Sequence, residues 1–423
     1  MSVATMKQSQ NATRVWRLAL AGVKGLLAPS PLKASFFLLF LFPAFLLAQT
    51  RFQPNDSAVL FRLDSQFNKT DDLQQALRVW QANPQDIASA TSAAKTAFLA
   101  ASRHGDLRWL GTAKAMLDPW WVKPDLPSDT LFVRALVRQG MHDFGGALSD
   151  LNAAISVDPN QSEFWAWRFA VYMVRSDIAK ASAECQAIGD RFGAAEQASC
   201  SAVLLYRTGR PRLAIEKLDE LARHPDYQGK NAKEWLAFHQ GEARRVAGDV
   251  QAANKAWQSY LKQGHAAHGI QVALLDGLIQ AGDFTSALSL NMGPQRSDAL
   301  LVSAIQAAQA LNNGQESALR ADIEQRLRQR ELRGESLNER PFVKYYLYVR
   351  QDPRKALEMA KESWKTEREP ADALLFAQAA LRSGEPLQAA SLLQWQTETG
   401  YKEPEFDRLL GQIKSATVSK SKQ

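Results

Sequence analysis

Cysteine is scarce in this 423-residue sequence, which contains only Cys185 and Cys200. Two cysteines are too few for a disulfide-dense scaffold, and no CxxC pair indicates a zinc or redox site. The motifs GxSxG, GxxxxGK[ST] and HExxH and the EF-hand loop are also missing. His265 and His268, in "HAAH", lack a third metal ligand nearby in the sequence. The sequence therefore predicts no enzyme, no cofactor and no metal.

Acidic residues are absent from the first 50 residues, which carry five Lys or Arg. Three more lysines follow Gln412. Removing these eight charges from the formal net charge of +7 leaves −1 for the body of the chain. A nucleic-acid-binding protein would carry a basic patch or stripe on its folded body. We therefore expect no nucleic-acid partner.

Long apolar runs are absent except for "ASFFLLFLFPAFLLA", residues 34–48. Fifteen helical residues span about 22 Å, less than a hydrocarbon core of about 30 Å, but flanking Lys33 and Arg51 can extend that span. We predict a transmembrane signal-anchor helix at 34–50 with a cytoplasmic N-terminus, because the preceding segment is purely basic. A cleaved signal peptide is the alternative, although 33 residues precede the run and Leu46 suits a cleavage site poorly. A buried helix is the third reading.

A repeated pattern, a turn followed by a small residue, extends over the rest of the chain. The stretch "HDFGGALSDLNAAISVDPN", residues 142–160, returns in weaker forms, each with a turn and then a small residue that opens a second helix. These residues are 33 to 39 positions apart: Leu110, Ala147, Ala181, Ala214, Ala253, Ala287, Ala321, Ala356 and Ala389. The Ala147 unit has two extra residues after Gly140, and Ala321 is the least regular member. The pattern predicts stacked antiparallel helix pairs and no sheet.

The units "FWAWRFAVYMVRSDIAKASAECQAI" and "EWLAFHQGEARRVAGDVQAANKAWQSYL" resemble tetratricopeptide repeats, and the resemblance covers roughly residues 90–400. It implies an all-α solenoid, a right-handed superhelix of helix pairs, that binds proteins. The chain departs from the family at 291–340, where a charge-rich exposed helix is expected to replace a repeat.

The resemblance also implies a concave groove lined by first helices. Its residues here are Glu196, Ser199, Tyr206, Arg207, Trp235, Phe238, Glu242, Arg245, Tyr345, Tyr348, Gln378 and Arg382. Aromatic and Arg side chains are common anchors of protein interfaces. Trp235 and Phe238 have an alternative role, because helix-spaced aromatic residues often pack between helices.

Cys185 and Cys200 fall on neighbouring antiparallel helices, about seven residues on either side of a turn near Gly193. That placement makes a disulfide feasible in an oxidising compartment. The alternative is two small buried apolar side chains.

The organisation expected is a basic cytoplasmic segment (1–33), the membrane helix (34–50), a helical linker or cap (51–89), the solenoid (90–412) and a disordered basic tail (413–423). We expect a single-pass inner-membrane scaffold whose solenoid is periplasmic and binds protein partners of a cell-envelope complex. Two alternatives remain: an enzyme or enzyme subunit with an unrecognised site, and a soluble periplasmic binding protein after signal cleavage.

Overall fold

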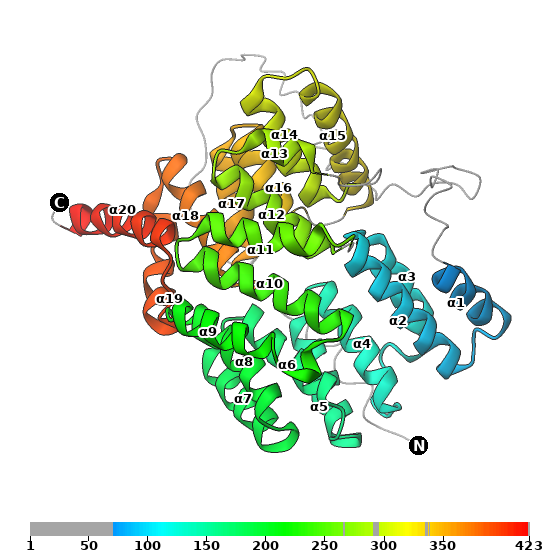
Figure 1. Cartoon of the computed structure of the whole chain (residues 1–423). Coiled ribbons are helices and arrows are strands. Elements are labelled where there is room, and N and C mark those ends of the chain that lie inside the picture. The colour runs from blue at the N-terminus through cyan, green and yellow to red at the C-terminus, as the bar shows by residue number, and fades with distance from the viewer. Residues whose placement is uncertain (1–70, 265–266, 291–295, 335–336, 338, 422–423) are drawn as a thin grey trace, which may run out of the picture. The chain divides into compact units, whose positions relative to one another are not determined.

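A computed structural model describes residues 71–264, 267–290, 296–334, 337 and 339–421, and every regular element in these ranges is a helix (Figure 1). The all-α prediction is confirmed for them. The elements are α1 (Asp71–Ala82), α2 (Ile87–His104), α3 (Arg108–Leu117), η2 (Asp118–Trp120), α4 (Ser128–Gly140), α5 (Phe144–Val157), α6 (Ser162–Val174), α7 (Ile178–Phe192), α8 (Ala194–Arg207), α9 (Pro211–Leu221), η3 (Pro225–Tyr227), α10 (Lys230–Val246), α11 (Val250–Leu261), α12 (His268–Gln280), α13 (Phe284–Ser289), α14 (Asp298–Leu311), α15 (Glu316–Arg333), α16 (Arg340–Lys344), η4 (Tyr345–Val349), α17 (Pro353–Ser363), α18 (Pro370–Arg382), η5 (Pro386–Ala389), α19 (Ser391–Thr399) and α20 (Pro404–Ser421).

Consecutive helices pack as the antiparallel pairs that the repeat predicts: α4 with α5, α6 with α7, α8 with α9, α10 with α11 and α12 with α13. In each of these pairs the fourth residue of the second helix is a fully buried alanine, namely Ala147, Ala181, Ala214, Ala253 or Ala287. A side chain this small lets the partner helix approach closely. At Gly241 of α10 the approach is closer still, because an added Cβ would lie 2.0 Å from Nε1 of the buried Trp257.

The second helices start at a recurrent N-cap. Asp143, Asp177, Asp249, Asp283 and Asp352 each accept a hydrogen bond from the backbone N–H three residues on. Such a side chain satisfies one of the otherwise unpaired N–H groups at a helix start and is worth roughly 1 kcal/mol. The repeated aspartate therefore fixes where these second helices begin, whereas α9 has Arg210 at this position and no side-chain cap.

The residue before each cap lies in the left-handed region, whether or not it is glycine. His142, Ser176 and Gln351 have φ of 64°, 54° and 55° at the place that Gly248 and Gly282 fill in other units. The turn of the Ala147 unit is therefore His142 rather than Gly140, which belongs to α4. The expectation of two extra residues in that unit was wrong, because the unit has a normal turn made by a histidine.

The Ala321 unit does depart from the repeat. Ala321 is exposed on α15, whereas Ile323 and Leu327 of the same helix are 0% and 6% exposed. Ala321 was therefore the wrong choice of buried residue. The helix is rich in charged residues, as expected, and it packs against α14.

The C-terminal boundary also needs correction. A disordered tail was expected from residue 413, but α20 continues to Ser421. Phe406, Leu409, Leu410 and Ile413 follow one helix face and are all buried, which extends the core beyond residue 412. The predicted segments 1–33 and 34–50, and the linker up to residue 70, lie outside the described residues. Among the described helices, none combines the length and the apolar character needed to cross a membrane.

Candidate binding surface

The predicted groove residues form two groups, one on α8 and α10 and the other on η4 and α18. Tyr206 and Tyr345 are 4% and 1% exposed, so the prediction that they line an open surface is wrong. Each faces a neighbouring helix. The Tyr206 hydroxyl shares a hydrogen bond of 2.9 Å with Nδ1 of His239, and the Tyr345 hydroxyl donates to Glu324 at 2.8 Å.

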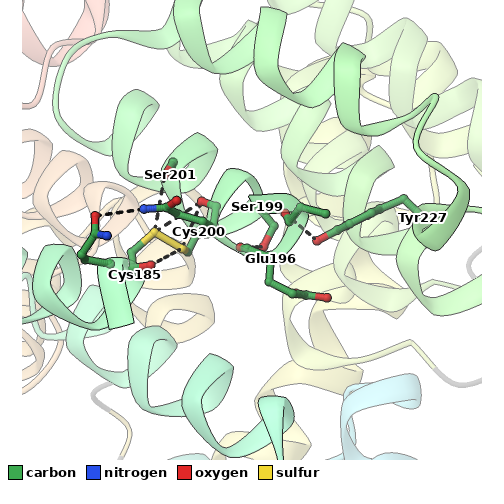
Figure 2. The surroundings of a disulfide bond; sticks show 9 residues. Cys185, Glu196, Ser199, Cys200, Ser201 and Tyr227 are labelled. Atoms are coloured by element: carbon green, nitrogen blue, oxygen red, sulfur yellow. Dashed lines mark hydrogen bonds between the residues drawn. A yellow bond between two sulfur atoms is a disulfide. The ribbon is translucent and has the colours of Figure 1, made fainter. Parts of the chain in front are cut away.

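Trp235 and Phe238 lie half-buried among other aromatic rings of α10 and its neighbours. The Trp235 ring centroid is 4.3 Å from that of His239 and 6.2 Å from that of Tyr227. Tyr227 in turn lies beside Ser199 and Glu196 of α8, two further predicted groove residues (Figure 2). The aromatic side chains of this group therefore pack mainly on one another.

His239 is the titratable member of this cluster. Burial, with the nearby charge of Arg207 adding to it, lowers the pKa of His239 to about 3. A histidine in an unfolded chain titrates near 6.5. The folded state therefore holds His239 neutral over the whole interval in which the unfolded chain takes up a proton.

We expect stability to fall as the pH drops below about 6.5, because the unfolded state then binds one more proton at this position than the folded state does. His239→Gln should remove up to about 1.4 kcal/mol per pH unit of that loss. Urea unfolding at pH 7, 5.5 and 4.5 measures it. His224→Gln is the control, since His224 is exposed and should leave the slope as it is. An equal slope in wild type and His239→Gln would remove His239 as the cause.

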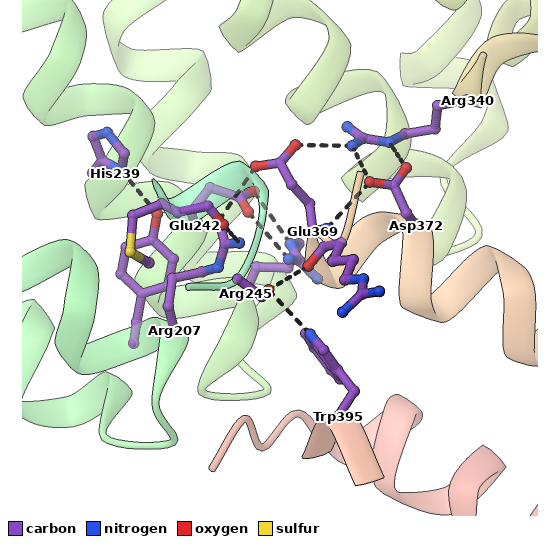
Figure 3. Close-up of polar contacts among 12 residues, drawn as sticks. Arg207, His239, Glu242, Arg245, Arg340, Glu369, Asp372 and Trp395 are labelled. Atoms are coloured by element: carbon purple, nitrogen blue, oxygen red, sulfur yellow. Dashed lines mark hydrogen bonds and ion pairs between the residues drawn. The ribbon is translucent and has the colours of Figure 1, made fainter. Parts of the chain in front are cut away.

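Arg207 and Arg245 are the arginines of the first group, and both bind carboxylates from the C-terminal part of the chain. Figure 3 shows Arg207 beside Glu369 and Arg245 beside Glu242. Nη1 of Arg207 donates to Glu369 at 3.3 Å. Nη1 of Arg245 donates to Glu403 at 2.7 Å, and its other nitrogens bind Glu242. The two glutamates directly precede Pro370 and Pro404, which begin α18 and α20. Two predicted groove arginines thus each bind the residue before a helix that starts with proline.

These ion pairs belong to a longer line of contacts. The turns between first and second helices, together with the end of α12, form what we call the turn edge: His142, Ser176, Gly209, Gly248 and Gln280. They meet two segments, 367–369 and 395–405, which we call the C-terminal strap. In chain order His142 pairs with Glu367, Ser176 binds the Arg368 carbonyl, and Gln280 donates to Glu405 at 3.2 Å.

The strap also approaches the two glycine turns closely. A Cβ on Gly209 would lie 2.4 Å from the Gly400 carbonyl oxygen, and one on Gly248 would lie 3.2 Å from Pro404. Near the start of the line, the Arg368 N–H donates to the Val174 carbonyl at 2.9 Å. Five consecutive units therefore contact the strap in the same order as the strap's own sequence.

The contact with Glu367 shifts the pKa of His142. Its hydrogen bond to Glu367 raises the pKa of His142 above its ordinary value, against the opposing effect of burial. The ion pair is therefore complete at lower pH and is lost as the pH rises through the raised pKa.

The second group surrounds a π-helical turn. The Arg350 N–H donates to the Tyr345 carbonyl, five residues back, and this geometry defines η4. π-helical turns are rare and occur frequently at functional sites. Beside it, the exposed Arg382 stacks 4.9 Å over the Tyr348 ring and donates to the Leu347 carbonyl. The Tyr348 hydroxyl donates to Gln378, the remaining predicted groove residue.

An open cavity of about 430 Å³ lies at this π-helical turn. Its lining residues are Leu347, Tyr348, Gln351, Pro353 and Arg382. Two of the predicted groove residues, Tyr348 and Arg382, thus line this cavity, whereas Arg207 and Arg245 are held by the strap.

Ser303, Lys344 and Asp276 form a polar cluster in which Ser303 is buried. Ser303 Oγ donates to Asp276 at 2.8 Å and accepts from Lys344 Nζ at 2.9 Å. Ser303 is 1% exposed, so no substrate reaches it, and the three residues tie α12, α14 and α16 together. In the ranges the structure describes, no three His, Cys, Asp or Glu side chains are placed to hold a metal ion.

Cys185 of α7 and Cys200 of α8 are joined by a disulfide (Figure 2). Their Cα atoms are 5.6 Å apart, and the side chains are 3% and 5% exposed. The bond links the second helix of one unit to the first helix of the next. Of the two alternatives drawn from the sequence, the structure has the disulfide, and the bonded pair is also buried.

Comparisons with known proteins give only distant likenesses. No known family profile and no curated protein matches the chain. A chain of the APC/C hetero-tetramer Cut9-Hcn1 is 12% identical with a TM-score of 0.39, over 73% of this chain and 52% of that one. A tetratricopeptide repeat protein from Parabacteroides merdae ATCC 43184 is 11% identical with a TM-score of 0.31, over 68% and 98%. The TPR domain of P58(IPK) is 14% identical with a TM-score of 0.23, over 83% and 100%.

The chain spans about half the length of the first of these structures. The identities and TM-scores are too low to assign a family. The description of the array as tetratricopeptide-like therefore rests on its own series of helix pairs, with a buried alanine and a left-handed turn at fixed places in most of them.

Proposed function

We propose that the chain is a membrane-anchored, tetratricopeptide-like scaffold that binds a protein partner in the cell envelope. The observation that carries the proposal is the in-register array of helix pairs, because stacked pairs form an extended surface along the array. A surface of this kind suits an extended protein partner better than it suits a small substrate.

The partner surface we assign is the cavity at η4, with Arg382 and Tyr348 as its anchors. Stacking on Tyr348 and the bond to Leu347 hold the Arg382 guanidinium in place, so a partner loses little side-chain freedom when it binds there. Arg and Tyr are the residue types that dominate protein interfaces. Arg207 and Arg245 are excluded from this assignment, because the strap already occupies them.

The assignment is tested by tagged pull-down from detergent-solubilised membranes, with retained proteins identified by mass spectrometry. Arg382→Glu should lose a stoichiometric partner that wild type retains, by tenfold or more, with an unchanged unfolding midpoint. Arg212→Glu is the matched control, since Arg212 is exposed at the start of α9 and far along the chain from η4. Equal retention by both variants would move the partner surface elsewhere.

The membrane part of the proposal is supported by the apolar run at 34–48, by the basic and acid-free segment before it, and by the disulfide, which suits an oxidising compartment. Mass spectrometry of the N-terminal peptide from membranes washed with carbonate tests it. An intact N-terminus in the membrane pellet supports the anchor. An N-terminus near residue 49 in the soluble fraction supports the cleaved alternative.

A further inference from the structure

The first described helix, α1, carries the residue pattern of a second helix. In α5, α7, α11, α13 and α17 an aspartate is followed by an apolar residue and, three positions later, by an alanine. In α1 these residues are Asp72, Leu73 and Ala76, although the helix itself begins one residue before them, at Asp71. Leu73 is 3% exposed, and α1 packs on α2 as α5 packs on α6. The spacing therefore identifies α1 as the second helix of a unit.

The face of α1 that should meet a first helix is incompletely covered. The alanine of the pattern is fully buried in each of the other five helices, whereas Ala76 is half-buried. Four positions after the alanine, Trp257 of α11 is 0% exposed, whereas Trp80 of α1 is half-buried. In α11 this face packs on α10, the first helix of the same unit. Among the described elements α1 packs mainly on α2, at the end of the array (Figure 1).

The indole N–H of Trp80 lacks the partner that its counterpart has. Nε1 of Trp257 donates to the Phe238 carbonyl of α10 at 3.2 Å, and a Cβ on Gly241 would lie 2.0 Å from this nitrogen. Nε1 of Trp80 is buried, and no described residue accepts a hydrogen bond from it. An unsatisfied buried donor costs about 1–3 kcal/mol. We therefore expect an acceptor from outside the described residues.

The sequence directly before α1 has apolar residues at the positions of a first helix. In α12, three residues that are four positions apart lie on one helix face and are buried: Ile270, Leu274 and Leu278. They precede the alanine of their own pair, Ala287, by 17, 13 and 9 positions. At the same distances before Ala76 the sequence again has three apolar residues: Val59, Leu63 and Phe67.

We propose that residues 57–69 form the first helix of a further unit and dock antiparallel on the open face of α1. The three apolar residues cover Ala76, and Asp64 accepts the hydrogen bond from Trp80. Asp64 precedes Trp80 by 16 positions, as Gly241 precedes Trp257, so its carboxylate stands beside the indole nitrogen.

This segment is the occupant of the face because of where it ends in the chain. A first helix that ends at residue 69 leaves residues 70–72 before Leu73, and α4 and α5 are likewise separated by the three residues 141–143. A segment joined to α1 by so short a turn has an effective concentration at that face that a separate chain does not reach.

The proposed helix moves the start of the array to residue 57. Eight residues, 49–56, then separate it from the apolar run at 34–48, and an extended chain of that length spans at most about 29 Å. Where the run anchors the chain, the first unit lies close to the membrane surface. The docking itself stands independently of the anchor and of the partner surface assigned at η4.

Hydrogen exchange of the full chain in detergent tests the docking. Amides of residues 57–69 should exchange about tenfold or more slowly than they would in an unfolded chain. Leu63→Asp should remove this protection and speed exchange in α1 by about tenfold, because a charge without a partner is costly to bury. Amides of α5, from Ala147 to Ile155, should exchange as in wild type.

Ser65→Asp is the matched control, because Ser65 corresponds to Asp276 of α12, whose side chain is 41% exposed. This variant should keep the protection of wild type. Unprotected amides at 57–69 in wild type, or equal exchange in Leu63→Asp and Ser65→Asp, would overturn the docking. Protection of α1 that disappears on dilution, while 57–69 is unprotected, would instead indicate a second copy of the chain on this face and would also overturn it.

Discussion

Arg245→Ala should lower the free energy of unfolding by about 3–5 kcal/mol, an effect larger than that of most point substitutions. The Arg245 side chain is 16% exposed, and the side chain of its partner Glu403 is 3% exposed. Glu403 also accepts from the Tyr401 hydroxyl at 2.5 Å, so its carboxylate is fixed in place and cannot turn to water. Removing Arg245 leaves that charge buried and without its cation, and leaves Glu242 beside it. Urea unfolding followed by circular dichroism measures the loss.

The next residue in the chain provides the control. Arg244 points to the other side of α10 and pairs with Asp219, with side-chain exposures of 22% and 39%. Arg244→Ala should therefore cost no more than about 1 kcal/mol. The double variant Arg245→Ala, Glu403→Gln should recover part of the stability, because it removes the unpaired charge as well. Similar costs for Arg244→Ala and Arg245→Ala would show that the bond to Glu403 does not hold the strap to α10.

The fold could be predicted from the sequence because the residues that specify it lie close together in the chain. A small residue in the first turn of each second helix and a turn residue five positions before it recur within one helix pair, and both can be counted along the chain. The count failed at Ala321, where the buried residue is Ile323, because α15 packs with a different spacing. It also misplaced the turn at His142, because a histidine in a left-handed conformation has no signal of its own in the sequence.

The contacts of the surface residues were harder to predict from the sequence, because the residues that make them lie far apart in the chain. Arg245 and Glu403 are 158 positions apart, and Arg207 and Glu369 are 162 apart. First-helix residues were expected to line a groove for a protein partner, whereas in the folded chain Arg207 and Arg245 contact the strap. Glu-Pro opens α18 at 369–370 and α20 at 403–404, but it also opens η5 at 385–386, so the dipeptide alone does not identify the strap. The π-helical turn at η4 has no recognisable pattern in "YYLYV".

Loss of the disulfide between Cys185 and Cys200 should lower the free energy of unfolding by about 3 kcal/mol, the value expected for a loop of about 15 residues. The two cysteines are 15 positions apart, and the bond fixes α8 against α7 at the junction of two units. The variant Cys185→Ala, Cys200→Ala should unfold at a lower urea concentration than wild type does. Reductant should shift the midpoint of wild type toward that of the variant and leave the variant itself unchanged.

Whether the disulfide forms depends on the compartment in which the chain folds. The state of the two cysteines therefore indicates that compartment. Protein recovered from an oxidising compartment should show no free thiols when it is denatured without reductant. The same chain expressed without residues 1–50 should remain in the cytoplasm, show two free thiols and unfold at the lower midpoint. Both sulfurs are buried, so neither form should convert to the other quickly while folded. Two free thiols in the membrane-associated protein would contradict an oxidising location, because a bond so well placed should form wherever thiols are oxidised.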